Sequence, residues 1–213
     1  MKSRKNFTMS ELVLVLAGAS VALVLFTAAT TEKQAKIVAC AARLAELEKI
    51  TTAYENDFGG TLISGNNNGK LWGALLARGG YFRKTGFYTR DGNQPKVMEC
   101  PAETRSREEG DRKFAHPTMG IAGSYDYGIN WLTHAKITGT GKANILRAAL
   151  KRPAQLIRIT EGTKFALLPV PNAVTDRHGE NAGNVLFEDG HVTFMEELPY
   201  KDAANYKASF WRN

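Results

Sequence analysis

Two hydrophobic patterns follow one another in the first third of the chain. Residues 12–31 contain no charged side chain, and an apolar run of about 20 residues is long enough to cross a bilayer as a helix. Beyond this run, the residues of one face recur at spacings of three and four, the period of a helix that buries one side. They are Ile37, Cys40, Leu44, Leu47, Thr51, Tyr54 and Phe58. No proline interrupts the pattern, so we predict one long helix from Phe7 to about Asp57, ended by Gly59 and Gly60.

A carboxylate, Glu11, stands at the start of the uncharged run. An ionised side chain at the centre of a spanning helix costs about 2.5 to 3.5 kcal/mol, so an acid in such a segment indicates a function. Lys2, Arg4 and Lys5 precede it, and the positive-inside rule places this end in the cytoplasm and everything after the run across the membrane. A cleaved signal peptide and a simple single-span anchor are the alternatives. Glu11 and the helical pattern that continues past the run argue against the signal peptide.

The clearest β pattern lies in residues 177–196, "RHGENAGNVLFEDGHVTFME". Asp189 and Gly190 are the residue types that a two-residue type I′ hairpin turn requires. Counting outward from this turn, Glu188 pairs with His191, and both lie on the face that points to solvent. The residues that would share the buried face are Val185, Phe187, Val192 and Phe194.

Composition and charge indicate one folded domain behind the apolar helix. The chain is 43% hydrophobic and 23% charged, which is typical of a globular protein. Its net charge of +7 comes partly from the first residues, and no basic stripe with interleaved aromatic residues follows. Residues 79–92 and 137–152 are basic, and we expect a solvated loop and a surface helix there, not a specific nucleic-acid site. No nucleophile elbow, phosphate-binding loop or zinc-protease motif is present, so we expect no enzymatic activity.

The chain has only two cysteines, Cys40 and Cys100. In an oxidising compartment an even pair favours a disulfide, and the spacing of paired CxxC metal sites is missing. The sequence alone leaves open whether the two Cα atoms come within bonding distance.

A divalent cation site is a second interpretation of the acidic and histidine residues near the carboxy end. His178, Asp189 and His191 could form it with Glu161 or Asp176. However, turn geometry explains the aspartate, a cross-strand pair explains one histidine, and the spacing matches no standard zinc or calcium loop. We therefore expect a structural hydrogen-bonding role for His178 and no cofactor, with calcium or another divalent ion as the alternative.

The stretch "NFTMSELVLVLAGASVALVLF" resembles the amino-terminal segment of type IV pilins and type II secretion pseudopilins. The resemblance implies that a prepilin peptidase cuts before Phe7 and that the new amine is methylated. Glu11 would then pair with the amino terminus of a neighbouring subunit during filament assembly. The chain departs from the family at two positions: Asn6 stands where the family has Gly before the cut, and Ala28 where many pilins have Pro.

The carboxy-terminal half resembles a large group of pilin-like proteins that carry an H-x9-DG element. Here ten residues, one more than usual, separate His178 from Asp189. The stretches "CAARLAELEKITTAYENDFGG", "MECPAETR" and "SYDYGIN" resemble further landmarks of the group, in the same order. Glu161 stands where the group usually has Asp. Cysteines matching Cys40 and Cys100 are commonly both present, so the resemblance also implies a disulfide.

Together these observations predict an α+β, pilin-like fold in which a long helix, membrane-spanning in its first half, packs on a small antiparallel β-sheet. We expect a leader at 1–6, a transmembrane assembly helix at 7–31, its periplasmic half at 32–58 and a globular domain at 59–213. The resemblance implies a structural subunit of a type IV pilus or type II secretion-like filament. Its partners would be the inner membrane, other pilin-like subunits, the prepilin peptidase and the assembly platform. The amino terminus would be cytoplasmic, and the domain periplasmic or on a surface filament. The alternative is a permanently anchored binding domain.

Overall fold

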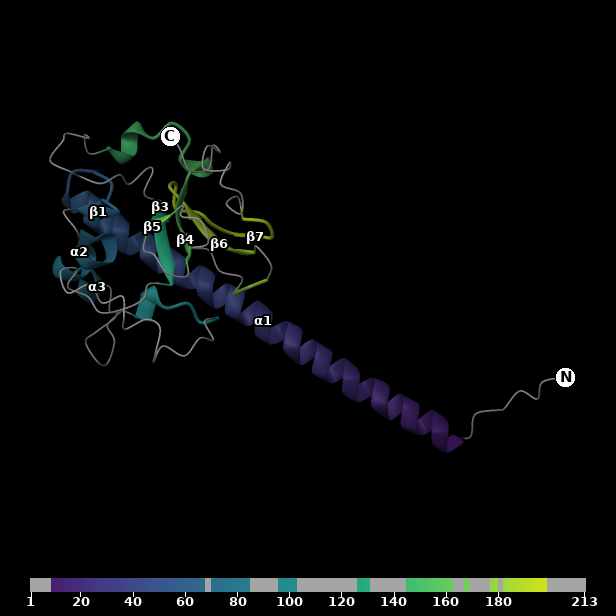
Figure 1. Cartoon of the computed structure of the whole chain (residues 1–213). Helices are drawn as coiled ribbons and strands as arrows, with labels where there is room; N and C mark the ends of the chain where they lie inside the picture. Colours follow the sequence, from purple (N-terminus) through teal and green to yellow (C-terminus); the bar gives the residue numbers. More distant parts are fainter. Residues whose placement is uncertain are drawn as a thin grey trace. The chain divides into compact units, whose positions relative to one another are not determined.

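The chain divides into two compact units, Met1–Lys36 and Ile37–Asn213. Figure 1 labels their helices and strands. The computed structural model describes residues 9–67, 70–84, 96–102, 126–130, 145–162, 167–168, 177–179 and 182–198.

Helix α1 spans Met9–Asp57, a length of 49 residues, so the prediction of one long helix ending near Asp57 is confirmed. Two glycines end it. Gly59 and Gly60 have φ angles of 66° and 80°, a left-handed conformation that glycine adopts without steric cost. The Gly60 amide donates a hydrogen bond to the Glu55 carbonyl at 2.7 Å, which satisfies one of the carbonyl groups that a helix end leaves unpaired.

The part of α1 in the second unit buries the face that the sequence pattern predicts. Ile37, Cys40, Leu44, Leu47 and Thr51 are all at most 8% exposed. The pattern fails at its end, because Phe58 lies beyond the helix, is 55% exposed and stacks on Tyr54 with ring centroids 4.5 Å apart. A second buried stripe runs beside the first and includes Ile50 and Glu55.

A five-stranded sheet forms the other layer of the second unit (Figure 1). Its strands are β3 (Tyr127–Asn130), β4 (Ile157–Glu161), β5 (Leu167–Leu168), β6 (Gly183–Phe187) and β7 (Val192–Met195). The order across the sheet is β5-β3-β4-β6-β7. The four strands from β3 to β7 in this order pair antiparallel, whereas the short β5 runs parallel to β3. The predicted α+β combination of a long helix and a small antiparallel sheet is therefore confirmed.

Short elements lie between α1 and β3 and between β3 and β4 along the chain. They are β1 (Asn66–Asn67), β2 (Lys70–Leu71), α2 (Trp72–Arg78), α3 (Tyr81–Lys84), η1 (Lys96–Met98), η3 (Arg147–Ala149) and η4 (Pro153–Gln155). β1 and β2 pair antiparallel as a separate two-stranded sheet. The expected surface helix over residues 137–152 lies partly outside the described residues. The described part, residues 145–152, contains η3 and an isolated bridge between Leu146 and Thr61, with no α-helix.

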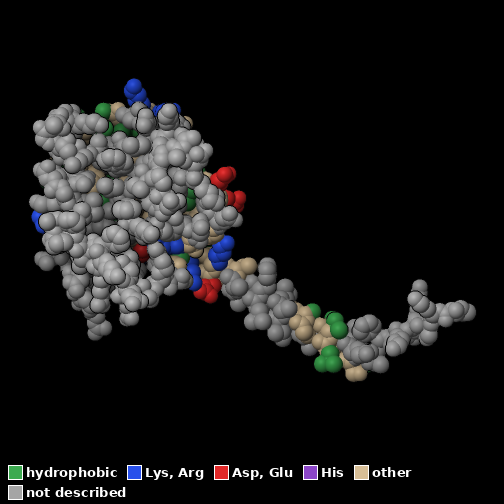
Figure 2. Space-filling view, in the orientation of Figure 1, with side chains coloured by type: hydrophobic (Ala, Val, Ile, Leu, Met, Phe, Trp, Pro, Cys, Tyr) green, Lys and Arg blue, Asp and Glu red, His purple; other side chains and the backbone are tan. Residues whose placement is uncertain are grey.

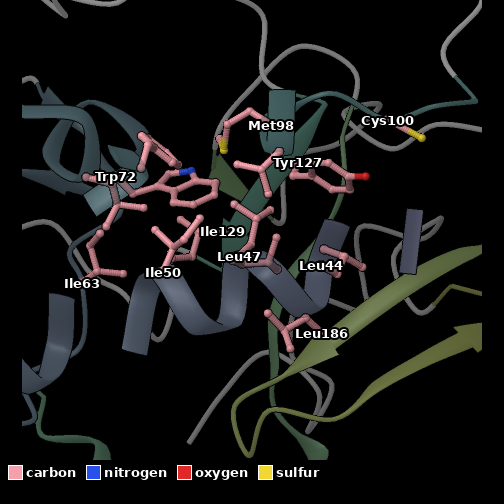
Figure 3. Close-up of a cluster of buried hydrophobic side chains, with 14 of the residues drawn as sticks. Leu44, Leu47, Ile50, Ile63, Trp72, Met98, Cys100, Tyr127, Ile129 and Leu186 are labelled. Atoms are coloured by element: carbon pink, nitrogen blue, oxygen red, sulfur yellow. The ribbon is translucent and has the colours of Figure 1, made fainter. Parts of the chain in front are cut away.

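One apolar core joins these layers. Figure 3 shows Leu47 of α1 beside Ile129 of β3 and Ile50 of α1 beside Trp72 of α2, and Leu44 belongs to the same cluster. These five side chains are fully buried. Because they come from three separate elements, α1, α2 and β3, the core holds α1 and the sheet in a fixed relation within the second unit.

The hairpin between β6 and β7 has a three-residue loop, so the predicted two-residue turn is wrong. Phe187 donates its amide hydrogen to the His191 carbonyl at 2.9 Å, and the Gly190 amide donates to the Phe187 carbonyl at 3.0 Å. The loop is thus Glu188, Asp189 and Gly190, and Gly190 has a φ of 96°. This is the arrangement of a tight turn followed by a left-handed glycine in a bulge.

The longer loop shifts the register by one residue and changes the predicted faces. The observed pairs are Gly183 with Met195, Asn184 with Phe194, Val185 with Thr193, and Leu186 with Val192. Leu186 and Val192 face the core, whereas Phe187 stacks on His191 with ring centroids 4.3 Å apart. Glu188 does not pair with His191 at the surface; its side chain is fully buried.

Glu188 belongs to a buried ion network between α1 and the sheet. Arg158 is fully buried and forms ion pairs with Glu48 and Glu55 of α1, the latter at 2.6 Å. Its Nε lies 3.9 Å from Glu188 Oε2. Arg147 also joins the network, 2.9 Å from Glu48 Oε1 and 3.5 Å from Glu55 Oε2. Three carboxylates therefore face two guanidinium groups, and the network connects α1 to both β4 and η3.

A β-bulge in β4 directs Arg158 into this network. Ile157 and Ile159 face consecutive residues of β6, Phe187 and Leu186, so Arg158 is the extra residue between them. Side chains normally alternate between the faces of a strand, and a bulge re-aims one of them. Here Arg158 and Ile159 both reach the α1 side, one in the ion network and the other in the apolar core.

In the first unit, the described side chains of α1 from Met9 to Ala35 are exposed, and Lys36 is half-buried. Val13, Leu14, Val15 and Leu16 are 58% to 72% exposed, and Figure 2 shows green apolar side chains on this part of the helix. A search of the described residues for a helix long and apolar enough to traverse a membrane finds none.

Candidate functional site

The candidate site is a buried polar cluster around a disulfide. Cys40 of α1 and Cys100, which follows η1, form the predicted disulfide, with Cα atoms 5.6 Å apart. Glu161 ends β4, and His178 lies in the segment just before β6. All four residues are at most 2% exposed. The fold thus brings together side chains from four separate segments, one of which is the long helix.

Glu161 and His178 are in direct contact. His178 Nε2 lies 3.0 Å from Glu161 Oε1 and 3.9 Å from Cys100 Sγ. Asn184 donates to the same Glu161 oxygen from its side-chain amide at 3.3 Å and from its backbone amide at 3.4 Å. The other oxygen, Glu161 Oε2, is buried and has no hydrogen-bond partner among the residues that the structure describes.

A second pair of charges positions the segments that carry Cys100 and His178. Asp126 Oδ2 accepts a hydrogen bond from the Cys100 backbone amide at 2.7 Å. Arg177, the neighbour of His178, donates to Asp126 Oδ1 at 3.1 Å and to the Gly162 carbonyl at 3.0 Å. These bonds fix both segments against the ends of β3 and β4.

Tyr127 completes the polar cluster on the sheet side. It is the cross-strand partner of Glu161 and is fully buried. Burial raises the pKa of Tyr127 well above its ordinary value, and the charges of Glu161 and Asp126 add to the shift. Figure 3 shows its hydroxyl group directed away from Trp72. Within the described part of the chain this hydroxyl has no hydrogen-bond partner.

The ligand atoms of Cys40, Cys100, Glu161 and His178 all lie within 4.8 Å of one another. Two sulfurs, an imidazole nitrogen and a carboxylate oxygen are donors that zinc accepts. In the disulfide form the two sulfurs are bonded to each other. The cluster then acts as a buried cross-link whose polar neighbours hold α1, β4 and the His178 segment together.

The other predicted site residues lie at the tip of the hairpin. Asp189 and His191 are exposed, and His191 Nδ1 lies 2.6 Å from Asp189 Oδ1. Gly190 sits between them, where an added Cβ would lie 3.3 Å from Glu48 Oε1. His178 instead contacts Glu161, so the residues of the alternative cation site, His178, Asp189 and His191, do not form one set of contacts among the described residues. Asp176, its alternative member, lies outside the described residues.

Most of the residues that we predict to take part in leader cleavage and assembly lie outside the residues that the structure describes. Asn6 and Phe7 precede the described residues. Glu11 lies in the first turn of α1, and its side chain is not described. α1 continues as a helix through Ala28, where many pilins have a proline. The interpretation of these residues stays a prediction.

Sequence reasoning missed Asp126, Arg177 and Asn184 as partners of the cluster. Two of them carried a signal, because Arg177 adjoins His178 and Asp126 lies inside the stretch "SYDYGIN". Asn184 carried none, since its role depends on how β6 pairs with β4. Its side-chain amide also donates to the Ile37 carbonyl of α1 at 3.1 Å.

Comparison with known proteins gives no relative from which a function could be transferred. No family model, no curated protein and no solved structure matches the chain.

Proposed function

We propose that this chain is a pilin-like structural subunit of a type IV pilus or of a type II secretion-like filament. One observation carries the proposal. A single 49-residue helix contains the uncharged run, with Glu11 at its start, and also supplies the buried face of an α+β domain. A segment that served only as an anchor would need neither the acid nor a direct helical connection to the domain core.

In this proposal the first part of α1 inserts in the inner membrane and later forms the filament core. Glu11 meets the amino terminus of a neighbouring subunit, made when the leader is removed before Phe7. A carboxylate and an ammonium group are each costly in an apolar bundle, and the pair neutralises both charges. The exposed apolar side chains from Val13 to Leu16 supply the surface that lipids or neighbouring helices cover.

The second unit would present the filament surface. The disulfide and the Arg158 network hold the outer part of α1 to the sheet within this unit. A rigid attachment suits a subunit that must transmit the movement of its helix to its domain during assembly. The domain acts by contact with cargo or other subunits and needs no catalytic group.

Replacement of Glu11 tests the proposal. We expect Glu11→Leu to insert in membranes as well as the unchanged chain, because it removes a charge from the apolar run, and to be lost from the sheared filament fraction. Glu32→Gln is the matched control. Glu32 lies on the same helix, is exposed and forms a local ion pair with Lys36 at 2.6 Å. If Glu11→Leu entered filaments normally, the role given to Glu11 would be wrong.

The alternative, a permanently anchored binding domain, rests on Asn6 in place of the family's Gly before the cut. The two proposals predict different experimental results. An anchored domain would keep residues 1–6 and would remain in the membrane fraction whether or not Glu11 is replaced.

A further inference from the structure

We propose that the dithiol form of this chain binds one Zn²⁺ ion through Cys40, Cys100, Glu161 and His178. The disulfide and a zinc site would then be alternative cross-links at one buried place. This inference concerns the second unit and does not rest on the filament function.

The geometry needs little change. In a tetrahedral zinc site with bonds of about 2.0 to 2.3 Å, ligand atoms lie about 3.3 to 3.8 Å apart. The four candidate atoms lie within 4.8 Å of one another, so the widest gap must close by about 1 Å. His178 Nε2 is 3.0 Å from Glu161 Oε1 and 3.9 Å from Cys100 Sγ. Once the bond between the sulfurs is broken, side-chain rotation can open the space between them for the ion.

The orphaned oxygen of Glu161 supports a ligand at this place. Glu161 is fully buried, and its Oε2 has no hydrogen-bond partner among the described residues. A buried polar atom without a partner costs free energy, and a metal–oxygen bond would remove that cost. Asn184 donates a hydrogen bond to the other oxygen of this carboxylate, and such a bond orients a carboxylate that binds a metal.

The charge balance also permits the ion. Two thiolates cancel the two positive charges of Zn²⁺, and the Glu161 carboxylate leaves the site with one negative charge. The disulfide form with Glu161 ionised and His178 neutral has the same net charge. Exchange of one cross-link for the other therefore adds no net charge to the interior, which limits its desolvation cost.

The types of ligand atom determine which metal ion the site prefers. Thiolate sulfur and imidazole nitrogen favour zinc, whereas calcium takes oxygen ligands only. Cys40, Cys100, Glu161 and His178 come from four separate segments, so the ion would staple α1 to the sheet as the disulfide does.

The exchange requires a thiol or phosphine reductant. A dithiol gives two electrons to the Cys40–Cys100 bond, which breaks to give two thiols, while the dithiol becomes a disulfide. Binding of Zn²⁺ then displaces one proton from each thiol to solvent, and two sulfur–zinc bonds form. Affinity should accordingly rise with pH.

Cobalt titration of the full chain in detergent tests the proposal, because Co²⁺ reports its ligands by colour. After anaerobic reduction with a phosphine, we expect one equivalent of Co²⁺ to give a thiolate-to-cobalt charge-transfer band and the visible bands of tetrahedral cobalt. Zn²⁺ should abolish both. The oxidised chain should give neither. Absence of the thiolate band in the reduced chain would overturn the proposal.

Two variants distinguish this site from binding by cysteines alone. Glu161→Gln and His178→Gln should each weaken metal binding by about tenfold or more. His191→Gln is the control, because His191 is exposed at the hairpin tip and should leave the affinity unchanged. Equal affinities for all three would contradict the proposal.

If a variant does not fold, a stability measurement on the unmutated chain still tests the proposal. The near-ultraviolet circular dichroism and melting temperature of the unmutated, reduced chain are recorded with and without Zn²⁺. Zinc should raise the melting temperature and restore any signal lost on reduction, since only the folded form brings all four ligands together and so binds the ion more tightly than the unfolded chain. If zinc changes neither, the proposal is wrong.

Discussion

Arg158 donates a hydrogen bond to Glu55 at 2.6 Å, and neither side chain is more than 1% exposed. The two residues are 103 positions apart in the sequence. Glu55 also accepts from the Ile63 amide at 3.2 Å, just after the end of α1. The pair therefore fixes both the position of α1 on the sheet and the path of the chain that leaves it.

Removal of the Arg158 charge should be strongly destabilising. Arg158→Met fits an apolar side chain into the same space but leaves three carboxylates with Arg147 alone. The loss of one partner from a buried ion pair costs about 3 to 5 kcal/mol. Urea unfolding of the full chain in detergent measures this loss of unfolding free energy. Lys49→Met is the control: it breaks the exposed pair with Glu46 and should change stability by less than about 1 kcal/mol. Similar losses for both variants would contradict a special role for the network.

Gly190 links the hairpin to the same network. A Cβ at this position would meet Glu48 Oε1 at 3.3 Å, and the φ of 96° is strained for any other residue. Gly190→Ala should cost more than about 1 to 2 kcal/mol, the price of the left-handed backbone alone. Gly59→Ala is the comparison, because Gly59 also has a positive φ but its added Cβ would meet nothing within 4 Å. An equal loss of unfolding free energy in both variants would exclude the contact with Glu48.

The helix and its end could be predicted from the sequence because their causes are local. The spacing from Ile37 to Thr51 and the glycines after Asp57 act within a few residues of each other. The spacing also predicts burial of Phe58, but the helix ends at Asp57 and Phe58 is exposed. Helical periodicity does not show at which residue the helix ends.

The hairpin register and the ion network could not be predicted in this way. Asp189 and Gly190 suit both a two-residue turn and a three-residue loop. The apolar pattern cannot distinguish the two-residue turn from the three-residue loop, because Val185, Leu186 and Phe187 are all buried and β6 has no face exposed to solvent. The Arg158 network depends on a bulge in β4 and on partners far along the chain. The disulfide could be predicted because the chain has just two cysteines and because the resemblance to the pilin-like group also implies the pair.

Stability should fall at high pH partly because of Tyr81. Burial, then its hydrogen bond to Asp57 at 2.8 Å, raise the pKa of Tyr81 to about 12. The folded chain keeps this proton to a higher pH than the unfolded chain, whose pKa is about 10. The contribution of Tyr81 to the free energy of unfolding is therefore complete below about pH 10 and is lost as the pH rises toward 12.

Tyr81→Phe tests this effect. The variant lacks the titrating group, so its unfolding free energy should fall less steeply than that of the unmutated chain from about pH 10 upward. Lysines and other tyrosines, including Tyr127, titrate in both proteins and cancel in the comparison. Parallel curves for the two proteins would show that Tyr81 does not titrate as described.

Loss of the disulfide should destabilise the second unit. The bridge joins residues that are 60 positions apart, and chain entropy assigns a bridge of this span about 4 kcal/mol. The double variant Cys40→Ala, Cys100→Ala should therefore unfold at lower urea concentration. Alkylation followed by intact mass gives an independent check: the unmutated chain should take up two alkyl groups only after reduction. Uptake without reductant would show free thiols instead.

The central claim, that this chain is a processed filament subunit, is tested most directly at its amino terminus. The measurement is the intact mass of the membrane-extracted chain, together with amino-terminal sequencing. The account predicts a chain that begins at methylated Phe7, so that Glu11 has an amine partner. A chain that retains residues 1–6 would contradict it and would favour a permanently anchored domain.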